Sequence, residues 1–302
     1  MKLVTYSRKQ QPRLGAVAGD QIVDLADLAA AEGKQLPSDM LAFIEASPAA
    51  LALARELLQR RAGNWPAGCA TALAGTKLLA PIQRPTKGVF GVGLNYAKHV
   101  DESSRTMQTQ SDIPSHPVIF IKPATAVVGP NDAIEHNAAL TQQLDWEAEL
   151  GVIIGRRAKH VRKEDALDYV FGYTCLNDVS ARDLRHGGQW SFAKGQDTYC
   201  PMGPWIVTAD EIADPHALDI SLTVNGVTKQ NSNTRHMIFN THALIAHLSS
   251  GITLEPGDVI ATGTPEGVGI SYVPPQFLKA GDVVEITIQN VGVLRNPVVA
   301  AG

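Results

Sequence analysis

The spacing of apolar and polar positions predicts the elements of the first part of the chain. Short apolar segments separated by turn residues predict three strands, at residues 2–6, 14–18 and 21–24. Helical spacing follows, and Ser38 is placed to cap a helix over residues 39–46. Ser47-Pro48 then opens a second helix that runs to about Gln59. This order predicts a small α/β unit.

After a stretch rich in Gly and Pro, the pattern becomes one of strands separated by short helices. Strands are predicted at residues 88–93, 118–121, 150–155, 170–178, 205–207 and 218–226. Asn225-Gly226 indicates a hairpin, and residues 237–249 a helix that Gly251 ends. Residues 255–263 and 279–287 are similar segments, and in each a Gly-Asp turn leads into a predicted strand.

Strands outnumber helices in this second part, so the predicted fold class is mixed α/β and β-rich. We expect two domains: a small N-terminal α/β domain at residues 1–75 and a main domain at residues 76–302.

Composition narrows the class of protein. Of 302 residues, 44% are hydrophobic and 19% are charged, which is enough apolar surface for a sizeable core. The net charge of -4 comes from interspersed acids and bases, so nucleic acid is a poor partner. The first ten residues lack a signal-peptide core, and no apolar segment approaches the ~20 residues of a membrane span. With three widely spaced cysteines, this predicts a protein of the reducing cytoplasm.

Three acidic residues suggest a metal site. If residues 145–150 lead into the next strand as strand, Glu147 and Glu149 share one face, roughly 6.5–7 Å apart at Cα. An exposed acidic edge strand would look the same. Asp178 ends an apolar strand, where a charge needs a partner or an ion, although it could instead cap a following helix, a role that Ser180 fits better. Three carboxylates suit a hard cation such as Mg²⁺ or Mn²⁺.

Four motifs make the sequence similar to a known family. They are GVGLNYAKH (91–99), DWEAEL (145–150), NDVSARD (177–183) and TGTPEGVG (262–269). Together they resemble the fumarylacetoacetate hydrolase family, over about residues 78–298. The resemblance implies a β-roll catalytic domain and Mg²⁺ or Mn²⁺ bound by Glu147, Glu149 and Asp178. It also implies a homodimer, and a small N-terminal domain like that of many members.

The same resemblance assigns catalytic and substrate-binding residues. His99 and Glu102, three apart on a predicted helix, match the family's catalytic pair, in which a carboxylate orients a basic imidazole. Lys194 matches its active-site lysine, Arg182 a substrate-side arginine and Thr264 a residue that binds the oxo-acid end. Taken alone, His-x-x-Glu and a lysine before glycine are more typical of a protein surface. The glycines of residues 262–269 lack the frame of a nucleotide-binding loop.

Two further features concern the substrate. Residues 103–117 form a polar segment closed by proline, which predicts a lid, although an ordinary loop would fit. Arg185 stands where many family members carry glutamine. If it lines the pocket, it suits a substrate with a second carboxylate; if it faces solvent, it has no such meaning.

The predicted reaction is metal-dependent hydrolysis of a carbon–carbon bond in a 2,4-dioxo acid, an acylpyruvate such as fumarylpyruvate or maleylpyruvate, releasing pyruvate. The alternative is an isomerase or decarboxylase of an unsaturated 2-oxo or 2-hydroxy diacid at the same site. A non-catalytic binding protein that keeps the fold is a third possibility, which the presence of His99, Glu102 and Lys194 disfavours.

Overall fold

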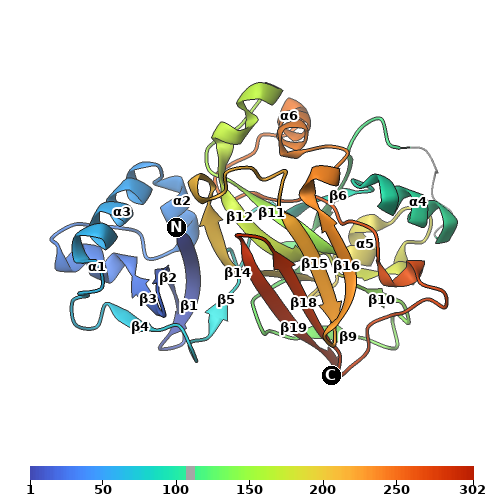
Figure 1. Ribbon diagram of the computed structural model, residues 1–302, viewed down its shortest axis with the longest axis horizontal. Coiled ribbons are helices and arrows are strands. Elements are labelled where there is room, and N and C mark those ends of the chain that lie inside the picture. Colours follow the sequence, from blue (N-terminus) through green and yellow to red (C-terminus); the bar gives the residue numbers. More distant parts are fainter. Residues whose placement is uncertain (107–112) are drawn as a thin grey trace.

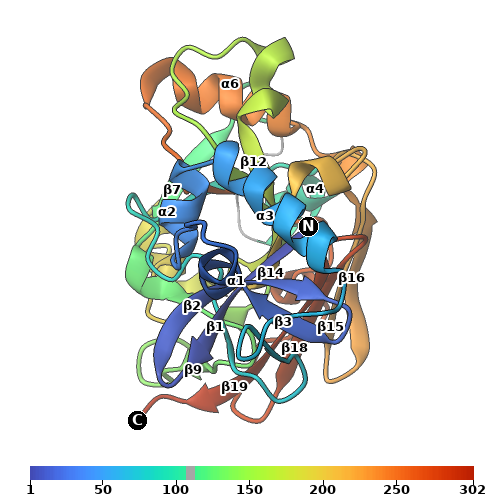
Figure 2. The ribbon, with the colours of Figure 1, turned by 90° about the vertical axis from the view of Figure 1, so that its left-hand side faces the viewer.

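The structure is a computed structural model that describes residues 1–106 and 113–302. Its N-terminal part lies at one end of the long axis, on the left of Figure 1. The strands there are β1 (Lys2–Arg8), β2 (Gln11–Ala18), β3 (Gln21–Asp24), β4 (Ala70–Ala72) and β5 (Leu78–Leu79). The helices are α1 (Leu25–Ala31), α2 (Met40–Glu45) and α3 (Ala49–Arg61), which lie together beside the strands (Figure 2).

The local chemistry explains how these elements begin. The three predicted strands are confirmed, but α1 was missed; its cap is Asp24, whose carboxylate accepts the Asp27 N–H. The predicted cap of α2 is wrong by one residue. Asp39, not Ser38, accepts the Ala42 N–H at 3.0 Å, since its carboxylate is the one that reaches the first turn.

The rest of the chain is mainly strand, as the sequence predicted. Its strands are β6 (Val89–Gly93), β7 (Val118–Lys122), β8 (Val127–Val128), β9 (Ile134–His136), β10 (Leu144–Asp145), β11 (Ala148–Ile154), β12 (Val170–Asn177), β13 (Ser180–Ala181), β14 (Cys200–Thr208), β15 (Asp219–Val224), β16 (Val227–Asn233), β17 (Val259–Ala261), β18 (Val283–Ile288) and β19 (Gly292–Ala300). The helices are α4 (Ala97–Thr106), α5 (Trp190–Lys194) and α6 (Thr241–Gly251). Short 3₁₀ turns are η1 (Ala124–Ala126), η2 (Lys163–Tyr169), η3 (Arg182–Leu184), η4 (Ala209–Glu211), η5 (Thr234–His236) and η6 (Gly269–Ser271).

One large sheet runs through the molecule, in the order β4-β3-β2-β1-β14-β12-β11-β17-β6-β7. Within it, β1 pairs antiparallel with β14, and Lys2 is opposite Val207. The strands of the N-terminal part therefore continue the sheet of the main part. The predicted boundary at residues 75 and 76 stays a prediction.

A second sheet packs against the central strands and encloses the main core. Its order is β16-β15-β18-β19-β9, and it covers β11 and β12 in Figure 1. Buried side chains from both sheets, including Leu150, Tyr173, Leu222 and Ile286, form one cluster. The predicted hairpin is confirmed, because Asn225-Gly226 has positive φ angles of 52° and 76° between β15 and β16. The result is a β-rich mixed α/β fold.

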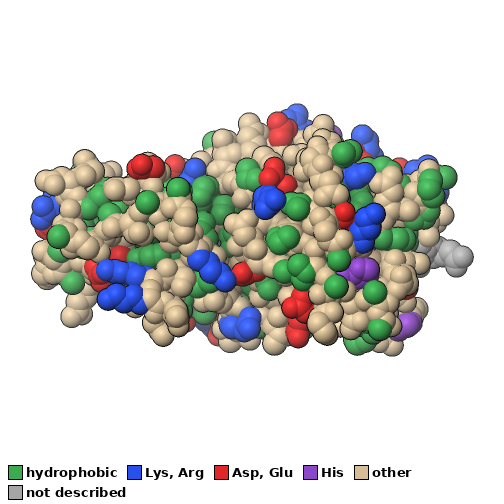
Figure 3. Space-filling model, turned by 90° about the horizontal axis from the view of Figure 1, so that it is seen from below, with side chains coloured by type: hydrophobic (Ala, Val, Ile, Leu, Met, Phe, Trp, Pro, Cys, Tyr) green, Lys and Arg blue, Asp and Glu red, His purple; other side chains and the backbone are tan. Residues whose placement is uncertain are grey.

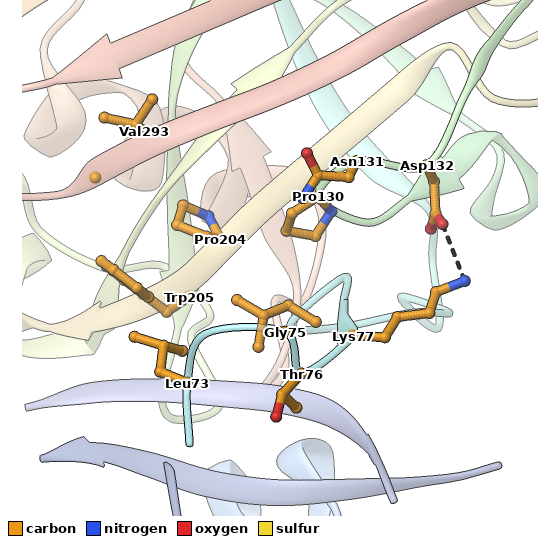
Figure 4. Close-up of a pocket in the computed structure, with 12 residues that line it drawn as sticks. Leu73, Gly75, Thr76, Lys77, Pro130, Asn131, Asp132, Pro204, Trp205 and Val293 are labelled. Atoms are coloured by element: carbon orange, nitrogen blue, oxygen red, sulfur yellow. Dashed lines mark ion pairs between the residues drawn. The ribbon is translucent and has the colours of Figure 1, made fainter. Parts of the chain in front are cut away.

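The surface carries acids and bases together, as the face in Figure 3 shows. A crevice lies where the turn before β5 approaches β14 and β19 (Figure 4). The Trp205 ring forms one wall, and an ion pair of 3.3 Å between Lys77 and Asp132 lies at the rim. All three cysteines are buried and free. Among the described residues, no helix has the length and apolar character needed to cross a bilayer.

Candidate active site

A buried cluster of three carboxylates lies where β11 and β12 meet. Glu147 immediately precedes β11, Glu149 lies within it, and Asp178 immediately follows β12. The two strands are antiparallel, with Ala148 opposite Asn177. The Asp178 N–H donates to the Glu147 carbonyl at 2.9 Å, which fixes the ends of the strands together. One carboxylate oxygen from each acidic residue lies within 4.8 Å of the others.

The chemistry of this cluster fits a divalent cation. Glu149 Oε2 accepts the Gly263 N–H at 2.8 Å, but Oε1 is buried and has no hydrogen-bond partner in the part of the chain that the structure describes. Burial, with the nearby Asp178 and Glu147 carboxylates, raises the pKa of Glu149 well above its usual range. A buried acidic oxygen without a partner is what a cation with oxygen ligands would satisfy. The predicted ligands are therefore brought together, and they fit a metal site.

Lys194, at the end of α5, is in contact with two of these carboxylates. Its Nζ donates to Glu147 Oε2 and to Asp178 Oδ2, both at 2.7 Å, and to Ser180 Oγ at 2.8 Å. Burial alone would lower the pKa of Lys194, but the Asp178 and Glu147 carboxylates outweigh it and raise that pKa. The side chain is therefore held as an ammonium.

Lys122, on β7, was missed by the sequence analysis. Its side chain is fully buried, and its Nζ donates to Asp178 Oδ1 at 2.5 Å, to the Val179 carbonyl at 3.2 Å and to the Lys194 carbonyl. It thus holds both a carboxylate of the cluster and the backbone that carries Lys194. The sequence did contain a signal for Lys122, because this charged residue directly follows the apolar segment VIFI. The same kind of signal identified Asp178.

Arg182, in η3, connects the cluster to a second acid. Its Nε donates to Asp145 Oδ2 at 2.9 Å, and its Nη1 pairs with Glu147 Oε1 at 2.7 Å. Burial would raise the pKa of Glu147, but the Lys194 ammonium and the Arg182 guanidinium hold it well below its usual range. The buried Nη2 of Arg182 has no partner within the described ranges. Asp145, within a recognised motif, was not assigned a role from sequence.

His99 and Glu102 form the expected pair on α4. His99 Nδ1 lies 2.9 Å from Glu102 Oε1, and both Glu102 oxygens accept the Gly267 N–H, at 3.1 and 3.0 Å. Because a carboxylate only accepts hydrogen bonds, Nδ1 carries the ring proton and Nε2 is the basic nitrogen. Ser103 Oγ is 3.5 Å from Nε2.

Thr264 is oriented by a residue that the sequence analysis also missed. Gln230, on β16, donates from Nε2 to Thr264 Oγ1 at 2.7 Å, and its Oε1 accepts the Ala148 N–H at 2.8 Å. The hydroxyl of Thr264 therefore accepts from Gln230 and retains its own proton for another partner.

A partly enclosed cavity is lined by most of the predicted residues. Its lining is Val92, Gly93, Leu94, His99, Glu147, Arg182, Arg185, Trp190, Lys194 and Thr264. Of the predicted residues outside this lining, Glu102 contacts His99, and Glu149 and Asp178 lie beside Glu147. Arg185 is thus on the cavity wall. Of the predicted lid, residues 103–106 belong to α4 and residues 107–112 lie outside the described residues, so the lid stays a prediction.

Comparison with known proteins identifies the class to which this fold and cavity belong. Residues 88–299 match the family described as fumarylacetoacetate (FAA) hydrolase, C-terminal. The chain belongs to the fumarylacetoacetate hydrolase family.

Particular relatives cover the whole chain. It is 43% identical to the mitochondrial oxaloacetate tautomerase fahd2 of Xenopus laevis, over 99% of this chain and 90% of the relative. It is 39% identical to the oxaloacetate tautomerase YisK of Bacillus subtilis, over 99% of this chain and 100% of the relative. A solved maleylpyruvate hydrolase from Sphingobium sp. SYK-6, in complex with manganese(II) and pyruvate, is 34% identical, with a TM-score of 0.79 and full coverage of both chains.

These relatives overturn the predicted reaction. Proteins that match along nearly the whole chain at 39–44% identity are named oxaloacetate tautomerases, not acylpyruvate hydrolases. The prediction of a carbon–carbon hydrolase is therefore wrong. The physical reason is that the motifs indicate a site shared across the family, and such a site does not by itself determine which bond of a substrate changes. That the protein is an enzyme of this family is supported.

Proposed function

We propose that the protein interconverts the keto and enol forms of oxaloacetate. The observation that carries the proposal is the pairing of an oriented base, His99, with an ammonium, Lys194, in one cavity of a chain whose full-length relatives are named oxaloacetate tautomerases. Keto–enol interconversion moves one proton between carbon and oxygen, so it needs a base beside the carbon and positive charge beside the oxygen.

His99 is the proposed base. In the keto-to-enol direction its Nε2 takes a proton from C3, and the electrons of the broken C–H bond form the C2=C3 double bond. The carbonyl oxygen on C2 gains a proton from solvent, and the imidazolium of His99 releases its proton to solvent, which regenerates the base. The reverse reaction returns a proton to C3, and neither water nor an oxidant is consumed. Glu102 stabilises the imidazolium that forms, because its carboxylate already accepts from Nδ1.

The other residues hold the 2-oxo-acid end. The Lys194 ammonium, buried among acids that keep it charged, stabilises negative charge that develops on the C2 oxygen. Arg182 Nη2 and the Thr264 hydroxyl are the donors that this cavity offers to the C1 carboxylate. A cation held by Glu147, Glu149 and Asp178, either Mg²⁺ or Mn²⁺, would supply a Lewis acid that polarises the 2-oxo group.

The test follows the ultraviolet absorbance of enol oxaloacetate as it converts to the keto form. With Mg²⁺ or Mn²⁺ present, the protein should accelerate the conversion above the rate in buffer, and nuclear magnetic resonance in D₂O should show faster deuterium exchange at C3. Rates equal to those of buffer with the metal alone would refute the proposal. Pyruvate measured in the same samples reports any loss of carbon from the substrate.

We also keep the homodimer and the cytoplasmic location as proposals. The free, buried cysteines are compatible with a reducing compartment. Sedimentation of the purified protein tests the first, and fractionation of the source cells tests the second.

A further inference from the structure

A tight turn places an aromatic ring on the guanidinium of Arg185. The N–H groups of Gly188 and Gln189 both donate to the Arg185 carbonyl, at 2.8 and 2.6 Å. After Arg185, the φ angles are 38° at His186, 73° at Gly187 and 133° at Gly188. The two glycines adopt these positive angles without a side-chain clash. The chain therefore turns back at once, and Arg185 Cζ lies 4.3 Å from the centroid of the Trp190 ring.

The Trp190 ring also contacts β7 and β6. It packs on Phe120, with ring centroids 5.7 Å apart, and it lies against the backbone of β6. A Cβ atom on Gly93 would lie 2.5 Å from Cζ3 of the ring, so only glycine admits the ring there. Arg185, Trp190 and Gly93 all line the cavity that contains His99 and Lys194. The guanidinium is therefore held on that wall by the packing of Trp190 against β6 and β7.

Arg185 and Arg182 place two guanidinium groups on the wall of the same cavity. Burial, and then the Arg182 guanidinium, lower the pKa of Arg185, which means that the two cations repel each other in a partly desolvated position. An anionic group of the substrate at this wall would offset the repulsion.

We propose that Arg185, positioned by Trp190, binds the second carboxylate of the substrate and so restricts the site to 2-oxo dicarboxylates. The inference rests on the proposed function only in taking a 2-oxo acid as the ligand of this cavity. Arg185 contacts the distal carboxylate, and Trp190 is a positioning residue that acts through it. A 2-oxo monocarboxylate would leave the guanidinium without this partner and would bind more weakly.

The test compares two unreactive ligands that differ only in the distal carboxylate. Malate and lactate are both 2-hydroxy acids, and only malate carries the second carboxylate. Calorimetry of the Mn²⁺-loaded wild-type protein should show malate binding about 10- to 150-fold more tightly than lactate, the usual effect of a hydrogen bond to a charged group. Arg185→Gln should reduce this ratio to near one, while the affinity for oxalate, which has no distal group, stays close to that of wild type.

Two further variants separate positioning from general damage. Trp190→Ala should lower the ratio and Trp190→Phe should restore most of it, because a ring is again present beneath the guanidinium. Arg156→Gln is a matched control, since Arg156 Cζ lies 4.2 Å from the centroid of the Tyr169 ring, outside the residues of the cavity, and its side chain is 56% exposed. This control should leave the ratio unchanged.

The outcomes are decisive in each direction. If wild-type protein binds malate and lactate equally well, the inference is overturned without any variant. The inference can therefore be tested even if Arg185→Gln fails to fold. An equal loss for malate and lactate in Arg185→Gln also overturns it, and an unchanged ratio in Trp190→Ala overturns the role of Trp190. If the wild type shows the ratio but no acceleration of enol conversion, the proposed function fails and the dicarboxylate site stands.

Discussion

Replacing Lys122 with methionine tests whether the carboxylate cluster depends on a buried ammonium. Lys122 is fully buried, and its Nζ bonds Asp178 and two backbone carbonyls. Methionine fills a similar volume but leaves Asp178 with a lone pair unmatched and the two carbonyls without their donor. Breaking a buried ion pair by removing one partner costs about 3–5 kcal/mol. For a chain of 302 residues that corresponds to a fall in Tm of roughly 5–8 °C.

The assay is thermal and urea unfolding of Lys122→Met in chelator and in Mn²⁺. Because a divalent cation beside Asp178 supplies positive charge that the variant lacks, Mn²⁺ should raise the Tm of the variant more than that of wild type. Lys77→Met is the control: Lys77 is 63% exposed and its pair with Asp132 lies at the rim of the crevice in Figure 4, so the cost should stay below about 1 kcal/mol. Equal stability of Lys122→Met and wild type in chelator, or an identical Mn²⁺ shift in both, would refute the reasoning.

Three other predictions concern the base, the metal and pH. His99→Ala should lower the turnover of enol conversion by roughly two to four orders of magnitude and leave malate binding intact by calorimetry; a loss of tenfold or less would remove His99 from the role of base. Asp178→Ala should abolish Mn²⁺ binding, and with it inhibition by oxalate, a planar analogue of the enol form; oxalate that inhibits equally well in chelator would contradict the metal site. Burial lowers the pKa of His216, whose Nε2 accepts the Thr241 N–H at the start of α6, so its contribution to stability is present above the unfolded pKa of 6.5 and is lost as pH falls below it. Urea unfolding at several pH values should show a shallower acid loss for His216→Gln, and an unchanged slope would contradict this.

The carboxylate cluster was predictable because local pattern and burial agree there. Glu149 and Asp178 are charges within or directly after strongly apolar strands, a position that requires a partner. The strand assignment itself was less accurate, since β11 begins at Ala148 and Glu147 precedes it. Glu147 reaches the cluster through its backbone bond with Asp178, which residue spacing alone does not reveal.

The supporting residues were less accessible to sequence reasoning because their partners are distant in the chain. Lys122 meets Asp178 across 56 positions, and Gln230 meets Thr264 across 34. Asp145 lies within a recognised motif, but its partners are Arg182 and the backbone of η6, which only the fold brings to it. Arg185 was limited in the same way. An arginine at this position suggested a diacid substrate, but only the fold, with the turn that follows Arg185, shows that the side chain lines the cavity.

The pairing of β1 with β14 has a consequence for shortened forms of this protein. On its other side β14 pairs with β12, the strand that Asp178 of the carboxylate cluster immediately follows. A chain without the first strands would leave Ile206 and Val207, the residues of β14 that pair with β1, as an open edge, which favours aggregation through edge-to-edge pairing. The N-terminal segment thus also covers an edge of the large sheet. A fragment that lacks this segment would need another way to cover that edge.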